Sequence, residues 1–185
     1  MKNAIIKTNA YAWTSQSKND ECYTPRYGVE VLLEFLPRFK NKIIWCPFDT
    51  EESEFVKVFK EHGYNVVYSH IWYGQDFYTY EPEKWDLMIS NPPFTNKAGI
   101  FKRALKFNKP FALLNSVLWL NDTTPTYLFA NKKLELLLLT KRIEYKNQTV
   151  NGKINFKSIY YCHDFLPNQI EIRDFNYGQR KLLEV

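Results

Sequence analysis

The sequence predicts an α/β domain in which helices cover both faces of a mostly parallel sheet. Short apolar runs alternate with segments of helical spacing along the chain, and each run is apolar throughout. Strands that are buried on both faces and separated by helices form parallel sheets. The 185 residues suit one such domain, and 45% hydrophobic residues supply its core, which excludes a disordered chain.

The chain divides into an N-terminal arm, residues 1–21, which is polar and poorly periodic, and a folded domain, residues 22–185. The expected elements of the domain follow one another without an evident linker or repeat. They are helices over residues 27–39, 52–62 and 98–107, a short helix ending at 131, and strands over residues 43–46, 65–69, 85–90, 111–116, 134–139, 158–162 and 169–173.

The helices are predicted from apolar spacing and from their boundary residues. Residues 27–39 carry apolar side chains three and four positions apart, and Pro25 suits a helix start. Residues 52–62 place Phe55, Val56 and Phe59 on one face, and Gly63 provides the stop. The later strands are recognised by continuous apolar runs, of which residues 134–139 are the clearest.

Composition limits the partners and the compartment. A net charge of +5 is compatible with a polyanionic partner but does not require one. Cys22, Cys46 and Cys162 show no metal-binding spacing, so we expect no metal site and reduced thiols in the cytoplasm. The sequence lacks a signal peptide and an apolar run of roughly 20 residues, so no membrane association is expected.

The segment Ser90-Asn91-Pro92-Pro93-Phe94 directly follows an expected strand. Ligands of open parallel sheets bind at the carboxyl ends of strands. Two prolines stiffen the loop and leave its carbonyls free to accept hydrogen bonds, while Asn91 adds a side-chain oxygen and Phe94 a flat apolar face. This set fits a nucleobase that carries an amino group, because two acceptors can hold the two amine hydrogens. The alternative is an ordinary Pro-Pro turn.

These residues resemble the N6-adenine methyltransferases, whose signature is (Asn/Asp/Ser)-Pro-Pro-(Tyr/Phe/Trp). The chain is most similar to small phage- and prophage-type enzymes and to adenine methylases of some restriction systems. The resemblance spans roughly residues 21–172. Its further marks are Tyr23-Thr24-Pro25, Trp45-Cys46-Pro47-Phe48-Asp49 with Ser53-Glu54-Phe55, Gly74-Gln75-Asp76-Phe77, Lys109-Pro110-Phe111-Ala112-Leu113-Leu114 and Arg142-Ile143.

The resemblance implies a Rossmann-like class I fold and S-adenosylmethionine as cofactor, with residues 22–185 as the catalytic domain. It places Asn91, Pro92, Pro93 and Phe94 in the catalytic loop, and Asn91 also beside the cofactor. The other cofactor-binding residues that it implies are Tyr23, Thr24, Pro25, Cys46, Pro47, Phe48, Asp49, Asp76 and Phe77. The chain departs from most relatives at residues 46–49, where they have a glycine-rich loop. Asp49 and Thr24 could instead be helix caps, and Asp76 a turn cap.

For the substrate, the resemblance implies adenine in DNA, flipped out of the duplex. Phe94, Lys97, Phe156 and Tyr160 are the expected substrate-binding residues, although a core position is an alternative for the last two. The chain is short for a full target-recognition domain, so readout falls to residues 121–127 and 144–156, to the arm, or to a second subunit of a homodimer. The location implied is the cytoplasm of a bacterium or phage-infected cell. Adenine in RNA, a glutamine side chain in protein, and a non-catalytic nucleic-acid-binding homologue are the alternatives.

Overall fold

The computed structural model describes residues 23–145 and 156–175, which form a seven-stranded sheet between two helical layers. The helices are α2 (Arg26–Glu30), α3 (Glu54–Glu61), α4 (Lys97–Lys106) and α5 (Thr123–Phe129), with 3-10 turns η1 (Leu33–Phe35), η2 (Pro37–Phe39), η3 (Ile71–Tyr73) and η4 (Val117–Asn121). The strands are β1 (Ile43–Cys46), β2 (Asn65–Tyr68), β3 (Leu87–Ser90), β4 (Phe111–Ser116), β5 (Glu135–Leu139), β6 (Ser158–His163) and β7 (Ile170–Arg173).

The sheet has the order β2-β1-β3-β4-β6-β5-β7. Strand β6 pairs antiparallel with both of its neighbours, while the other pairs are parallel, so the sheet is mixed, with six strands in one direction. The predicted α/β class is confirmed. The reversed strand β6 places the residues before it, including Phe156, at the same edge as the carboxyl ends of the other strands.

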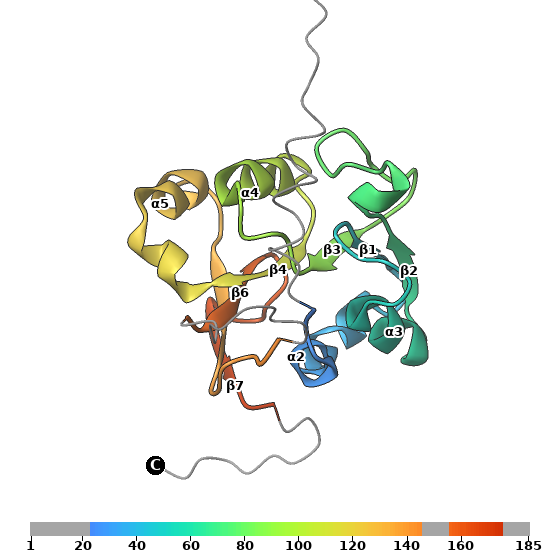
Figure 1. The fold of residues 1–185 in the computed structure, drawn as a ribbon. Coiled ribbons are helices and arrows are strands. Elements are labelled where there is room, and N and C mark those ends of the chain that lie inside the picture. The colour runs from blue at the N-terminus through green and yellow to red at the C-terminus, as the bar shows by residue number, and fades with distance from the viewer. Residues whose placement is uncertain (1–22, 146–155, 176–185) are drawn as a thin grey trace, which may run out of the picture.

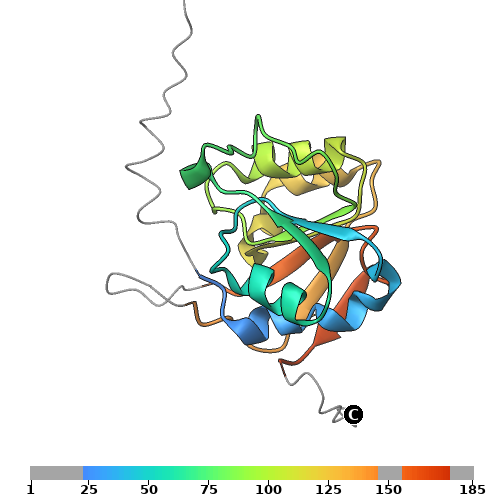
Figure 2. The same cartoon turned by 90° about the vertical axis from the view of Figure 1, so that its right-hand side faces the viewer.

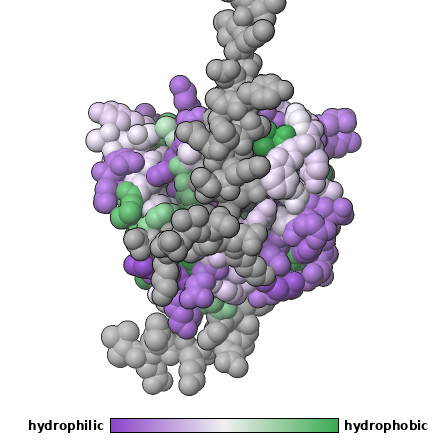
Figure 3. Space-filling model, in the orientation of Figure 1, coloured by the Kyte–Doolittle hydropathy of each residue, from purple (hydrophilic) through white to green (hydrophobic). Residues whose placement is uncertain are grey.

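Helices cover both faces of the sheet, as the sequence predicts. Helices α2 and α3 lie below it and α4 and α5 above it in Figure 1, and Figure 2 shows the same three layers from the side. One core cluster lies between the sheet and helices α2 and α3, and it includes Leu36 and Phe59. The other lies between the sheet and α4, and it includes Phe101 and Trp45. Figure 3 shows that the visible apolar surface is scattered in small patches among polar residues.

The prediction of one continuous helix over residues 27–39 is wrong. The segment contains the five-residue helix α2 followed by the 3-10 turns η1 and η2. Pro37 excludes an α-helix through residues 33–37, because it lacks a backbone donor and clashes with the carbonyl four residues earlier, although α2 itself already ends at Glu30. By contrast, α3 begins at a cap that the sequence supplies, since Ser53 Oγ accepts a hydrogen bond from the backbone N–H of Phe55.

The other predicted elements agree with the structure to within about two residues, as is usual at element ends. Cys46 and Cys162 are buried free thiols. The predicted arm, residues 1–21, and Cys22 lie outside the described residues, as does most of the segment 144–156.

Candidate active site

The sheet changes its direction of growth between β1 and β3. The chain passes from β1 outward to β2 and then returns to β3 on the other side of β1. At such a switch point the loops after the two central strands diverge and leave a crevice outside their carboxyl ends. The loop after β1 carries Asp49, and the loop after β3 carries Asn91 to Phe94, so both predicted functional segments flank this crevice.

Asp49 lies at the centre of a hydrogen-bond network that joins three strand ends. Its Oδ1 accepts a hydrogen bond from Ser53, the N-cap of α3, and its Oδ2 accepts one from Ser90 Oγ at 2.5 Å. Its backbone N–H donates to the carbonyl of Ser69, just after β2, at 3.2 Å. The Asp49 side chain therefore fixes the loop after β1 to the end of β3 and to the start of α3.

Asp49 is a buried carboxylate without a basic partner in the described part of the chain. The residue is 6% exposed, and burial raises its pKa to about 6, although the hydrogen bonds from Ser53 and Ser90 act to lower it. Two buried groups sense its charge. Burial, with the charge of Asp49 as a smaller cause, raises the pKa of the Cys46 thiol and of the Tyr160 hydroxyl. At neutral pH Asp49 is thus the ionised member of this group.

The Asn-Pro-Pro-Phe loop leaves β3 at the carboxyl edge, where the sequence placed it. Asn91 and Phe94 are half-buried, and Pro92 is buried. Asn96 ends the loop with a positive φ of 50°, and its Nδ2 donates to the Tyr78 hydroxyl at 2.7 Å. Lys97 then opens α4, half-buried. The catalytic roles of the four loop residues and the substrate role of Lys97 remain predictions.

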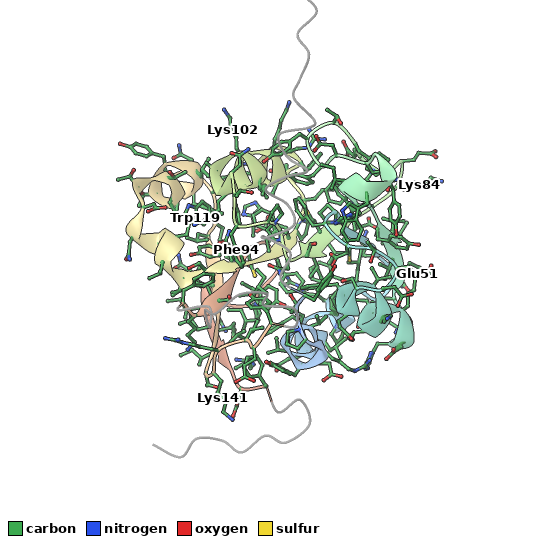
Figure 4. All side chains as sticks on the ribbon, in the orientation of Figure 1. Glu51, Lys84, Phe94, Lys102, Trp119 and Lys141 are labelled. Atoms are coloured by element: carbon green, nitrogen blue, oxygen red, sulfur yellow. The ribbon has the colours of Figure 1, made fainter. Side chains whose placement is uncertain are left out.

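Phe94 is part of an aromatic cluster at this edge. Its ring meets the ring of Phe156 edge to face at a centroid separation of 5.2 Å, and that of Tyr145 at 6.3 Å. The Tyr145 hydroxyl donates to Ser158 Oγ at 2.7 Å. In Figure 4, Phe94 lies near the middle of the molecule between the helical layers, whereas Lys102 points outward from α4. Phe94 and Phe156 are half-buried, so this part of the cluster retains accessible surface.

Tyr160 does not join the accessible part of this cluster. Its side chain is 0% exposed, and its hydroxyl donates to the carbonyl of Gly28 at 2.7 Å. We therefore correct the prediction that Tyr160 contacts substrate, because a ring enclosed in the core has no free face to offer. Its contact with Gly28 instead fixes α2 to the sheet.

Residues 23–25 lie just before α2. Tyr23 is 42% exposed, whereas Thr24 and Pro25 are buried. The hydroxyl oxygen of Thr24 forms no hydrogen bond within the described residues, and α2 has Pro25, not Thr24, at its N-cap. Thr24 is therefore not the helix cap that the sequence offered as an alternative. A buried hydroxyl without a partner is costly, and a polar ligand could satisfy it.

Most of the remaining residues predicted to bind the cofactor instead pack in the core or cap a turn. Phe77 is 3% exposed and packs against Trp45 and Phe48, so its ring is a core ring. Asp76 Oδ1 accepts the backbone N–H of Tyr78 at 2.9 Å, which is the turn cap that the sequence left open. Of the loop after β1, Phe48 is half-buried, whereas Cys46 and Pro47 have buried side chains.

Sequence reasoning did not single out Ser53 or Ser90 as partners of Asp49, or Tyr145 as a neighbour of Phe94. Ser53 precedes an expected helix and could have been recognised as its cap. Ser90 and Tyr145 carry no comparable local signal, because Asp49 lies 41 residues from Ser90 and Phe94 is also remote from Tyr145 in the chain. Ile71, Trp72 and Tyr73 of η3, all strongly exposed after β2, were also missed.

A groove of about 460 Å³ between α4 and α5 lies away from these residues. It is lined by Lys102, Leu105, Lys106, Asn108, Leu128 and Lys132. Several of these residues lie just before β4 and β5, and therefore at the amino edge of the sheet. Among the described residues, no cluster of His, Cys, Asp and Glu side chains could hold a metal ion. In the same residues no helix is long and apolar enough to span a membrane.

No family model and no curated protein matches the sequence. Among solved structures, the chain is similar to the modification subunit of a putative type I restriction enzyme from Vibrio vulnificus YJ016. The two chains share 12% identity with a TM-score of 0.49, over 82% of this chain and 47% of the other. The chain thus spans about half the length of that subunit.

Proposed function

We propose that this protein is an enzyme that transfers a methyl group from S-adenosylmethionine to the exocyclic N6 amine of adenine in DNA. The observation that carries the proposal is the position of the Asn91-Pro92-Pro93-Phe94 loop. It leaves β3 at the switch point of the sheet, hydrogen-bonded through Ser90 to the buried carboxylate of Asp49. The sequence resemblance to N6-adenine methyltransferases supports the same reaction.

The loop supplies the acceptors that the reaction requires. The lone pair of the adenine amine is delocalised into the ring, which makes the nitrogen a weak nucleophile. The Asn91 side-chain oxygen and the Pro92 carbonyl can accept its two hydrogens and so favour a pyramidal nitrogen with an available lone pair. The gain comes from orientation and from stabilising the positive charge that develops on nitrogen. With the amine held in this way, the cofactor would supply the methyl group and leave as its neutral thioether, and the methylated amine would lose one proton to solvent.

Phe94 and Phe156 offer the aromatic surface against which a base can be held. A base–aromatic stack is worth roughly 1–3 kcal/mol, which helps to offset the cost of removing a base from a duplex. Tyr145 supports the Phe94 ring from the buried side and is itself held by Ser158. The net charge of +5 is compatible with a nucleic-acid substrate.

The residues near Asp49 fit the proposed cofactor, which carries an ammonium, a sulfonium and a carboxylate. A buried carboxylate without a basic neighbour among the described residues is a suitable complement for cationic groups. The hydroxyl of Thr24, which has no hydrogen-bond partner among the described residues, suits a carboxylate. When bound, the cofactor supplies an electrophilic methyl group.

The test is incubation of the protein with S-adenosylmethionine labelled in the methyl group and a panel of duplex DNA, single-stranded DNA, RNA and protein. Digestion followed by mass spectrometry identifies the product. We expect N6-methyladenine in DNA. Label found only in RNA or in glutamine would replace the substrate in this proposal, and the absence of label together with absent cofactor binding would contradict enzymatic function.

A further inference from the structure

We propose that Asp49 and Ser90 act as a positioning pair that couples the loop after β1 to the direction of Asn91. The inference rests on the proposed function and adds a residue, Ser90, that the motif itself does not include. Ser90 is 0% exposed, is the last residue of β3, and donates its hydroxyl to Asp49 at 2.5 Å.

The stiffness of the loop explains why Ser90 matters. Pro92 and Pro93 fix φ at two positions, and a residue before proline is confined to extended conformations. Asn91 therefore has little freedom on its C-terminal side, and its placement depends on how the end of β3 is held. The bond to Asp49 holds that end from the other side of the switch point, because Asp49 lies in the loop after β1 and Ser90 ends β3.

The other contacts of Asp49 make it a fixed support. Ser53 holds its second oxygen, and the carbonyl of Ser69 holds its backbone N–H at 3.2 Å. A ligand cation that approaches the carboxylate competes for the same oxygens, so its binding alters the hold on Ser90. Coupling of this kind is reciprocal. If the bound cation changes the affinity for a substrate that orders Asn91 by some factor, the bound substrate changes the affinity for the cation by that same factor.

Among the titratable groups around Asp49, only the Asp49 carboxylate carries a charge at neutral pH. Cys46 of β1 and Tyr160 of β6 both sense Asp49, and burial keeps both protonated. Ser53 and Ser90 are its neutral hydroxyl partners. Its charge is therefore the variable through which a bound cation can act on the Ser90 hydroxyl.

The experiment compares Ser90→Ala with Ser116→Ala. Ser116 is a matched control, since it is a buried serine that ends the neighbouring strand β4 and its hydroxyl caps η4 instead of binding Asp49. Three quantities are measured: kcat and KM for methyl transfer to an adenine-containing oligonucleotide, the affinity for S-adenosylhomocysteine with and without that oligonucleotide, and the NMR signals of the Asn91 side-chain amide in the ligand-free protein.

We expect Ser90→Ala to lower kcat by about tenfold or more while KM changes little, to abolish the coupling between the two ligands, and to shift or broaden the Asn91 signals. Asp49→Asn, which removes the charge and keeps the side-chain shape, should also lower the coupling. Ser116→Ala should leave all three quantities near their wild-type values.

Unchanged Asn91 signals in Ser90→Ala would overturn the inference whether or not the protein is active. An equal loss of kcat in Ser116→Ala would also overturn it, because the effect would then be general loosening of the edge. A wild-type protein that transfers no methyl group would instead contradict the proposed function, and the NMR comparison of the two serine variants would still decide the positioning role.

Discussion

The two edges of the sheet shift the pKa of a carboxylate in opposite directions. At the amino edge, just before β3, Asp86 accepts the backbone N–H of Ile43 at 2.8 Å and lies 3.4 Å from Lys42 Nζ. The hydrogen bond from Ile43, with Lys42 as a smaller cause, lowers the pKa of Asp86. At the carboxyl edge, Asp49 is buried and its pKa is raised to about 6.

The ionised carboxylate of Asp86 is thus favourable in the folded state, whereas the ionised carboxylate of Asp49 is unfavourable there. Nearby at the amino edge, Lys109 Nζ donates to the carbonyl of Trp85 at 2.8 Å and lies over its ring at 3.9 Å. Both contacts of the Lys109 ammonium are favourable in the folded state. The buried charge of Asp49 is unfavourable there, and groups that cost stability are commonly retained where function requires them. A buried charge of this kind at the carboxyl edge is what the proposed function predicts.

The largest effect is expected for Asn91→Ala at the carboxyl edge. Loss of one acceptor aimed at the reacting nitrogen should cost on the order of 3 kcal/mol in the transition state, and so more than a hundredfold in kcat. Cofactor affinity should change little. Steady-state kinetics and calorimetry check both quantities, and near-normal turnover would remove Asn91 from the catalytic role.

The next effect is a gain in stability for Asp49→Asn that depends on pH. A folded-state pKa of about 6, against the ordinary 3.8, favours folding at low pH, and this contribution is lost as pH rises from about 4 to 6. Above pH 6 the variant should therefore be more stable than wild type, by at most about 3 kcal/mol, and the gain should shrink below pH 4. Thermal melts at pH 4 and 8 test this, and a destabilised variant at pH 8 would break the comparison.

Phe94→Ala should weaken substrate binding and turnover, by roughly 1–3 kcal/mol in all if a base stacks on the ring. Phe94→Trp keeps a flat face and should retain much of the activity. If Phe94 serves only the core, Ala should cost about 3–5 kcal/mol of stability and Trp should be impaired as well. Melting temperatures and kinetics of both variants distinguish these outcomes.

The smallest effect is expected at the amino edge. Asp86→Ala should lower stability at pH 7 by about 1 kcal/mol through the lost backbone hydrogen bond. Because the pKa of Asp86 is lowered on folding, its contribution exists above about pH 3.8 and disappears as pH falls further. Chemical denaturation at pH 7 and pH 3 measures the difference. Methyl transfer should stay at the wild-type level, and a large loss of activity would show that the two edges are not separate in function.

The outcome for individual residues shows which interactions can be inferred from local sequence. Helix α3 is predicted correctly because the apolar spacing of Phe55, Val56 and Phe59 is a local signal. The segment over residues 27–39 is not one continuous helix, although its apolar spacing is helical, and Pro37 excludes an α-helix through its last part. Phe77 was expected beside the cofactor and is a core ring, since burial depends on residues such as Trp45 that lie elsewhere in the chain.

The sequence by itself determined the α/β class, the strand that ends at Ser90, and the Asn-Pro-Pro-Phe loop after it, because apolar periodicity and proline stiffness act over a few residues. Only the tertiary structure decided that β6 runs antiparallel, that Tyr160 is enclosed in the core, and that Asp49 bonds Ser90 across 41 positions of the chain. Burial, raised pKa values and hydrogen bonds between loops are properties of the packed arrangement. They arise when the sheet brings distant strand ends to one edge and excludes water from the groups between them.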